Sequence, residues 1–97
     1  MIKLVYTDAA QDDLAAFYAG LSAQGGEALA SAGLEGLLNR CEDLSRFPDM
    51  GGRRADLDGM GLRARAIGEK GRLIVYVRRG DALHIVRIVR DEPSYDG

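Results

Sequence analysis

The sequence predicts a single α+β domain: an N-terminal strand, an antiparallel helical hairpin, and then a three- to four-stranded antiparallel sheet. Three observations predict this fold class. The chain has 97 residues, a length that suits one domain spanning residues 1–97. Apolar residues recur at helical spacing over the first half of the chain and at strand spacing over the second half. A glycine pair, Gly25-Gly26, divides the helical half into two segments.

The N-terminal strand is expected at residues 2–7, where Ile2, Leu4 and Tyr6 alternate with Lys3, Val5 and Thr7. Thr7 or Asp8 can cap the helix that follows, because either side-chain oxygen can accept hydrogen bonds from the first free backbone amides. This first helix carries one apolar stripe with spacings of four, three and four residues: Ala10, Leu14, Phe17 and Leu21.

The second helix is expected to turn back against the first after the break at Gln24-Gly25-Gly26, because a two-glycine break is short. Its stripe repeats the same spacing at Ala30, Leu34, Leu37, Cys41 and Leu44. Gly33 and Gly36 each weaken the helix by up to about 1 kcal/mol, but they allow the two helices to approach closely. Phe47-Pro48 ends the helix, since proline disfavours helical backbone in the residue before it.

After a loop at residues 49–54, the sequence predicts strands at residues 62–67, 73–77 and 82–90, with a weaker one at 55–57. The run Leu73-Ile74-Val75-Tyr76-Val77 is typical of a strand covered on both faces. Turns at residues 68–71 and at Gly80-Asp81 make the three main strands antiparallel neighbours. Residues 91–97 are expected to form a mobile tail.

The composition excludes several classes of protein. At 46% hydrophobic and 29% charged residues, the chain is expected to fold rather than stay disordered. No apolar run approaches the roughly 20 residues of a membrane span, and the N-terminus does not resemble a signal peptide. We therefore expect no membrane partner and a cytoplasmic location.

The chain offers little for catalysis or metal binding. A single cysteine excludes an internal disulfide, and Cys41 with His84 cannot make a structural zinc site. Cys41 lies on the second apolar stripe, where we expect a small buried hydrophobe. None of the four serines stands beside a candidate base, and Gly51-Gly52 is not followed by the lysine of a phosphate-binding loop. We predict no catalytic residue, no metal site and no cofactor.

The net charge of −2 hides an asymmetry between the two halves. Residues 1–50 carry three basic and eight acidic side chains, whereas residues 51–97 carry ten basic and seven acidic ones. Nine of those ten bases are arginines, whose planar donor fork suits phosphate and carboxylate groups. The arginines form a local binding site for an anionic partner, or they simply keep a small sheet soluble.

Strand periodicity does not decide between these two interpretations. Arg63 and Arg65 point to the same side of the strand at residues 62–67. In the last strand, alternation gives one face with His84, Val86, Ile88 and Arg90, and one with Leu83, Ile85, Arg87 and Val89. Arg87 among apolar neighbours needs an edge position or an acidic partner. It either supports the fold or belongs to a cationic site.

The order of the elements and several short motifs resemble the RelE/ParE superfamily of bacterial toxins from type II toxin–antitoxin systems. The resemblance runs from about Leu4 to Arg90. The motifs that carry it are Tyr6-Thr7, Ala9-Ala10, Asp13-Leu14, Leu44, Phe47-Pro48, Met50-Gly51, Arg54, Leu57, Gly61-Leu62-Arg63, Leu73-Ile74-Val75-Tyr76 and Ile85-Val86-Arg87-Ile88-Val89.

The superfamily contains ribosome-dependent messenger RNA endoribonucleases, which are RelE-like, and inhibitors of DNA gyrase, which are ParE-like. The motif Gly61-Leu62-Arg63 and the strand Ile85–Val89 look more like the ParE branch. The last ParE strand commonly ends in histidine, whereas this chain has Arg90 there, and arginine cannot exchange protons near neutral pH. This departure weakens the nuclease interpretation more than the gyrase interpretation.

The resemblance implies a toxin that inhibits gyrase by protein contact, a cognate antitoxin, a toxin–antitoxin hetero-oligomer and a role in plasmid stabilisation. The expected target-binding residues are Arg63, Arg65, Arg87, Arg90 and Tyr95. Two alternatives stay open. One is a RelE-like endoribonuclease in which Arg63 and Arg65 hold phosphate and Tyr95 transfers a proton, and the other is an inactive toxin homologue.

Overall fold

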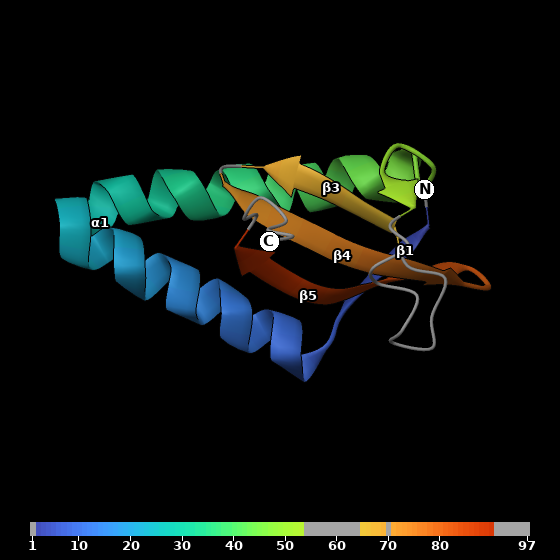
Figure 1. Ribbon diagram of the computed structural model, residues 1–97, viewed down its shortest axis with the longest axis horizontal. Coiled ribbons are helices and arrows are strands. Elements are labelled where there is room, and N and C mark those ends of the chain that lie inside the picture. Colours follow the sequence, from blue (N-terminus) through green and yellow to red (C-terminus); the bar gives the residue numbers. More distant parts are fainter. Residues whose placement is uncertain (1, 54–64, 70, 91–97) are drawn as a thin grey trace, which may run out of the picture.

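The computed structural model describes residues 2–53, 65–69 and 71–90, in which one bent helix packs on a face of a five-stranded sheet (Figure 1). The elements, in chain order, are β1 (Lys3–Tyr6), α1 (Asp8–Arg46), β2 (Gly52–Arg53), β3 (Arg65–Glu69), β4 (Arg72–Arg79) and β5 (Ala82–Arg90). The α+β class predicted from the sequence is confirmed.

The helical half begins and ends as the sequence predicts. The Thr7 side chain caps α1 by accepting a hydrogen bond from the Ala10 amide, and the helix ends at Arg46, just before Phe47. The predicted hairpin of two helices is not matched in full, because α1 is a single 39-residue element. Only Gly26 departs from helical geometry, with φ 87° and ψ −179°, and the helix bends sharply there.

The bend divides α1 into a first arm (residues 8–25) and a second arm (residues 27–46), which lie on either side of the sheet's long axis in Figure 1. The predicted apolar stripes face the core, since Ala10, Ala30, Leu37, Cys41 and Leu44 are all fully buried. Gly33 serves the close approach that we expected. A methyl group there would collide with the Leu21 Cδ1 atom and press on the Phe17 ring of the first arm.

The sheet has the strand order β1-β5-β4-β3-β2, and it is mixed. Strands β2 to β5 are antiparallel to their neighbours, but β1 pairs with β5 in parallel, with Leu4 opposite Leu83 and Tyr6 opposite Ile85. The prediction of three to four antiparallel strands is therefore not matched exactly, because the sheet also includes β1, which joins it in parallel. Tight turns dictate antiparallel pairing only between strands that are consecutive in the chain, and the whole of α1 separates β1 from the strands that follow it.

The predicted strand boundaries agree best with the structure where the turns between strands are short. Strand β5 has the predicted limits, and β4 extends the predicted run by a residue or two at each end. Gly68 and Glu69 belong to β3 rather than to a turn, and Gly52–Arg53 forms a short strand in the predicted loop. The expected strand at residues 55–57, the start of the strand at 62 and the expected tail at 91–97 lie outside the described residues.

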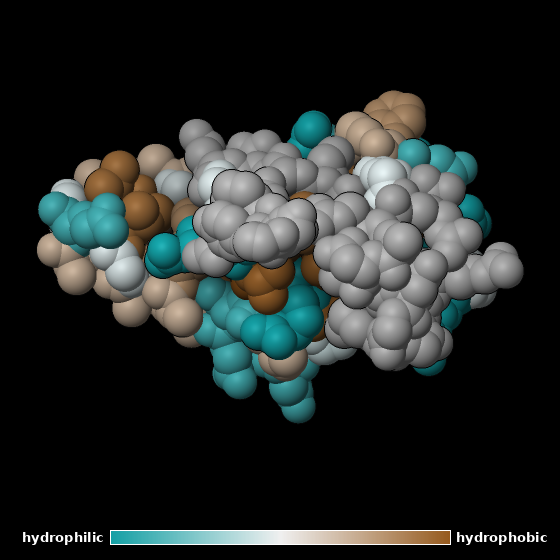
Figure 2. All heavy atoms as spheres, viewed as in Figure 1, coloured by the Kyte–Doolittle hydropathy of each residue, from teal (hydrophilic) through white to brown (hydrophobic). Residues whose placement is uncertain are grey.

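The main core lies between α1 and one sheet face, where Ile74, Tyr76, Leu83, Ile85 and Ile88 meet the buried residues of α1. A second buried cluster, Leu73, Val75 and Val77, lies on the opposite face. The residues of β4 from Leu73 to Val77 are thus buried on both faces, as predicted. Apolar atoms are exposed at the bend end of α1 (Figure 2), where Leu29 is 46% exposed. No described helix has the length and apolar character that spanning a bilayer requires.

The buried Tyr76 side chain pins the segment after α1 to the sheet. Its hydroxyl donates a hydrogen bond to the Pro48 carbonyl at 2.8 Å and accepts one from the Gly51 amide at 2.9 Å. These two bonds fix the point at which the chain leaves the helix and enters β2.

Tyr76→Phe should lower the free energy of unfolding by about 1–2 kcal/mol, because it removes both hydrogen bonds while keeping the ring. Urea denaturation measures the change, with an unchanged slope showing that the same surface is exposed on unfolding. Tyr18→Phe removes the same hydroxyl from a partly buried position of the first arm; it is the matched control and should shift stability by less than about 0.5 kcal/mol. Equal effects of the two substitutions would contradict the assignment.

Candidate functional site

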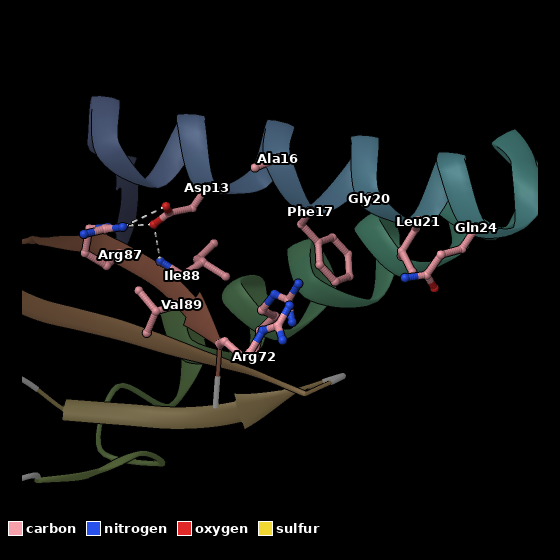
Figure 3. Close-up of a pocket in the computed structure, with 11 residues that line it drawn as sticks. Asp13, Ala16, Phe17, Gly20, Leu21, Gln24, Arg72, Arg87, Ile88 and Val89 are labelled. Atoms are coloured by element: carbon pink, nitrogen blue, oxygen red, sulfur yellow. Dashed lines mark hydrogen bonds and ion pairs between the residues drawn. The ribbon is translucent and has the colours of Figure 1, made fainter. Parts of the chain in front are cut away.

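A groove of about 470 Å³ runs between the first arm of α1 and the ends of β4 and β5 (Figure 3). The helix contributes an apolar wall that includes Phe17 and Leu21. The strands contribute three arginines, Arg72, Arg87 and Arg90. The groove is therefore apolar on one side and cationic on the other.

Asp13 ties the two walls together at one end of the groove (Figure 3). Its carboxylate accepts hydrogen bonds from Arg87 Nε at 2.7 Å and from Arg87 Nη2 at 2.9 Å, which is a bidentate ion pair. The same carboxylate accepts a hydrogen bond from the Ile88 amide at 2.8 Å. Strand β1 pairs with β5 only as far as Ile85. Beyond that point, Asp13 accepts a backbone hydrogen bond of β5 that a neighbouring strand would otherwise accept.

A β-bulge decides where the arginines of β5 point. The register shifts between Val75 and Tyr76, so that Tyr76 pairs with Ile85 but Val75 pairs with Arg87, which leaves Val86 as the extra residue. The residues of β5 that face the helix are consequently Leu83, Ile85 and Ile88. Strict alternation would have placed Ile88 on the other face from Leu83 and Ile85. Arg87 does not interrupt the core, because it lies opposite Val75 and reaches Asp13 from the sheet edge.

Arg72 and Arg90 lie directly opposite each other across β4 and β5. Like charges directly opposite each other on neighbouring strands repel each other. The Arg72 guanidinium carbon lies 5.1 Å from the centre of the Phe17 ring, which is a cation–π contact that holds the Arg72 side chain against the helix. The sheet end beside the first arm therefore concentrates positive charge.

The charges that line the groove are fixed near neutral pH. The hydrogen bonds from Arg87, with a smaller contribution from the Ile88 amide, hold the pKa of Asp13 below its ordinary value of 3.8. The same carboxylate raises the pKa of Arg87, and arginine stays protonated in proteins in any case. Asp13 and Arg87 therefore both stay charged at pH 7, so this pair can hold an ionic group but does not exchange a proton there.

The two other ionisable groups of interest lie away from the groove. Cys41 is fully buried, as predicted, and burial raises the pKa of its thiol to about 11, so it is not a nucleophile at neutral pH. His84 lines a smaller hollow elsewhere on the sheet with Thr7, Val77 and Arg79. Within residues 2–53, 65–69 and 71–90, no three metal-ligating side chains are grouped closely enough to hold a metal ion.

Comparison with known proteins identifies the family. Residues 4–95 match the family model described as the ParE toxin of the type II toxin-antitoxin system, parDE. The chain belongs to the ParE toxin family. A solved structure described as the chromosomal ParDE TA system from P. aeruginosa superimposes with a TM-score of 0.81 and 23% identity, covering 95% of this chain and 98% of that one. This likeness shows a shared fold. No curated protein matches the sequence.

Two of the five predicted target-binding residues come together in this groove. Arg87 and Arg90 both line it. The backbone of Arg65 lies in β3 opposite Tyr76, and β4 separates β3 from β5. Arg63 and Tyr95 lie outside the described residues.

Asp13, Phe17 and Arg72 line the groove but were not predicted to do so. The sequence placed Asp13 only in the Asp13-Leu14 motif of the family resemblance, and Phe17 only in the apolar stripe of the first helix. Counting back from the Gly80-Asp81 turn without a bulge would place Arg72 opposite Val89, whereas the extra residue in β5 places it opposite Arg90. No pattern in the sequence marks this bulge.

Proposed function

We propose that this ParE-family chain is the toxin of a type II toxin–antitoxin pair that acts in the cytoplasm, inhibits DNA gyrase by contact, and is neutralised by a cognate antitoxin. The observation that carries the proposal is the fixed charge of the groove. Three arginines and an ionised aspartate can bind an acidic surface of a protein without transferring protons. The family match over residues 4–95 points to the same class of activity.

The groove suits a protein partner better than a nucleic acid. Its apolar wall, with Phe17 and Leu21, can cover apolar side chains, while the opposite wall can bind carboxylates. The chain as a whole has a net charge of −2, which does not favour the long-range attraction that nucleic-acid binders use. We therefore assign Arg87 and Arg90 to partner contact, with Arg72 beside them, and keep Arg63, Arg65 and Tyr95 as further candidates.

The purified chain should inhibit supercoiling of relaxed plasmid by gyrase, and Arg90→Ala should raise the half-inhibitory concentration about tenfold, the effect of losing one good interface contact. Arg79→Ala is the matched control, because Arg79 is exposed at the far end of the same hairpin and should leave inhibition unchanged. Full supercoiling in the presence of excess toxin would contradict the proposal.

The alternatives give different results. A RelE-like endoribonuclease would generate new 3′ ends in toeprints of translating ribosomes, while leaving gyrase active. An inactive homologue would leave growth unchanged when the chain is induced without its antitoxin. Growth arrest with inhibited supercoiling and unchanged toeprints is the combination that we expect.

A further inference from the structure

We propose that two copies of this chain associate through one face of the second arm of α1, packed antiparallel, so that the Phe47 ring of each copy enters an apolar hollow of the other. The proposal goes beyond the proposed function and does not depend on it. It rests on an exposed ring, a hollow of matching character and the spacing between them along one helix.

The second arm has exposed apolar side chains at both of its ends. Within the described residues, the large apolar side chains that remain exposed are Leu29 (46%), Phe47 (63%) and Met50 (38%). Leu29 lies beside the bend, and Phe47 caps the other end of the arm, with Met50 just after it. Phenylalanine and methionine are enriched in the buried centres of protein interfaces, so we take Phe47 as the anchor of a contact.

The position of Phe47 is fixed by its backbone. Its amide donates a hydrogen bond to the Asp43 carbonyl at 2.9 Å, and its carbonyl accepts one from the Met50 amide at 3.0 Å. The next carbonyl, that of Pro48, accepts a hydrogen bond from the buried Tyr76 hydroxyl. The backbone is therefore ordered on both sides of the ring before any partner binds, which lowers the entropic cost of binding.

An apolar hollow of about 250 Å³ lies at the bend end of α1. Its described lining consists of Leu29, Ala32 and Gly33 from the second arm, and Phe17 and Leu21 from the first arm. A phenyl ring is smaller than this volume, and Phe17 offers it the edge-to-face or offset contact that aromatic pairs prefer. The hollow therefore suits an incoming phenylalanine.

The ring and the hollow lie on the same side of the second arm. Leu29 and Phe47 are 18 residues apart, which corresponds to five whole turns of an α-helix and about 27 Å. In an antiparallel pair of second arms, Leu29 of each copy can therefore lie opposite Phe47 of the other. Two-fold symmetry makes the two contacts identical, so a single face supplies both the ring and its receptor.

The middle of this face allows the two arms to approach each other. The exposed or half-buried residues between Leu29 and Phe47 on this side are Ala32, Gly36, Arg40 and Asp43. In the antiparallel register, Gly36 of one copy lies opposite Arg40 of the other, so the longest side chain meets a position without one. Arg40 and Asp43 lie 3.8 Å apart as an ion pair within each copy. These two opposite charges leave the face balanced, so two copies do not repel each other there.

The contact is small, so we expect a weak dimer. The second arm runs along the long axis of the molecule (Figure 1), which makes the whole face available. A helix face about 27 Å long and 10 Å wide buries less than the roughly 1,200 Å² of a standard interface. A dissociation constant of about 10–100 μM is the expected result.

Sedimentation equilibrium of the purified full-length chain tests this association. The wild type should pass from monomer to dimer, and no further, as its concentration rises from about 1 μM to 1 mM. Phe47→Ser should raise the dissociation constant at least about tenfold, because it removes the anchor of both symmetric contacts. Its Tm should stay unchanged, since the ring is exposed in the monomer.

Two charge substitutions in the second arm give a matched comparison. Ala32 and Ser31 are consecutive exposed residues, and of the two only Ala32 lines the hollow. Ala32→Glu places a charge where the Phe47 ring enters and should weaken the dimer about tenfold or more, because the ring would cover that charge. Ser31→Glu adds the same charge outside the hollow and should leave the dimer unchanged.

A measurement on the unmodified chain does not depend on how well a variant folds. In a mixture of isotope-labelled and unlabelled wild-type chains, intermolecular nuclear Overhauser contacts should join the Phe47 ring of one copy to the Leu21 and Leu29 methyl groups of the other.

A chain that stays monomeric up to about 1 mM would overturn the proposal, as would a Phe47→Ser or Ala32→Glu variant that dimerises as well as the wild type. Open-ended polymers would also overturn it, because the ring would then enter the hollow head-to-tail and not around a two-fold axis. None of these measurements involves gyrase or an antitoxin. A failure of self-association is therefore distinguishable from a failure of the proposed function.

Discussion

Gly26→Ala is expected to lower the free energy of unfolding by about 1–3 kcal/mol, because the bend of α1 holds this residue in a backbone region that is essentially restricted to glycine. With φ at 87° and ψ at −179°, an L-alanine is strained wherever its methyl group points. Nothing lies within 4 Å of that methyl position, so the cost is conformational and not a collision. Thermal denaturation followed by circular dichroism should show a fall in Tm of about 10 °C.

Two controls separate backbone strain from a general effect of added methyl groups. Gly20→Ala adds a methyl group to an ordinary helical position with open space and should stabilise the chain by about 0.5–1 kcal/mol. Gly26→D-alanine, introduced by chemical synthesis, fits positive φ and should keep or raise the wild-type stability. If L-alanine and D-alanine at position 26 behave alike, the bend does not depend on the glycine conformation.

Asp13→Ala is expected to lower the free energy of unfolding by about 2 kcal/mol at pH 7. The Arg87 side chain is 44% exposed, so solvent screening limits the ion pair itself to about 1 kcal/mol or less. The remainder comes from the Ile88 amide, which loses its carboxylate acceptor on the edge of β5. Asp13→Asn keeps an oxygen acceptor and should cost about half as much. Asp12→Ala removes the same charge from the neighbouring exposed position and should change stability by less than about 0.5 kcal/mol.

The contribution of Asp13 should also depend on pH. Because folding lowers the pKa of its carboxyl group, the folded state binds this proton less readily than the unfolded state. The stabilisation is complete above the unfolded pKa of about 4 and is lost as the pH falls through the lower folded value. Denaturant titrations between pH 5 and pH 2 should show this loss in the wild type and a flatter profile in Asp13→Asn. If the free energy of unfolding varies with pH in the same way in both proteins, Asp13 does not stabilise the contact between the first arm and β5.

The elements that the sequence predicted well are those that depend on neighbours in the chain. The limits of β5 and the turn at Gly80-Asp81 follow from alternation and turn residues, and the Thr7 cap and the stop before Pro48 follow from local backbone chemistry. The stripes from Ala10 to Leu44 were predicted for the same reason, since helical spacing selects the buried face directly.

The parallel pairing of β1 with β5 was not predictable in this way, because about 75 residues separate the partners in the chain and no turn links them. The bulge at Val86 was equally hidden. A single extra residue exchanges the two faces of a strand, and an alternating sequence such as Ile85–Val89 is compatible with either outcome.

The amino-acid sequence by itself determined the class of the fold, the helical stripes, the hairpin of β4 and β5, and the resemblance to a toxin superfamily. Each of these follows from the spacing of residues that are close together in the chain. Only the tertiary structure decided that Asp13 meets Arg87, that Arg72 faces Arg90, and that the first arm of α1 closes a groove beside them. These contacts join residues that are far apart in the chain, and the balance of packing, register and charge over the whole domain selects them.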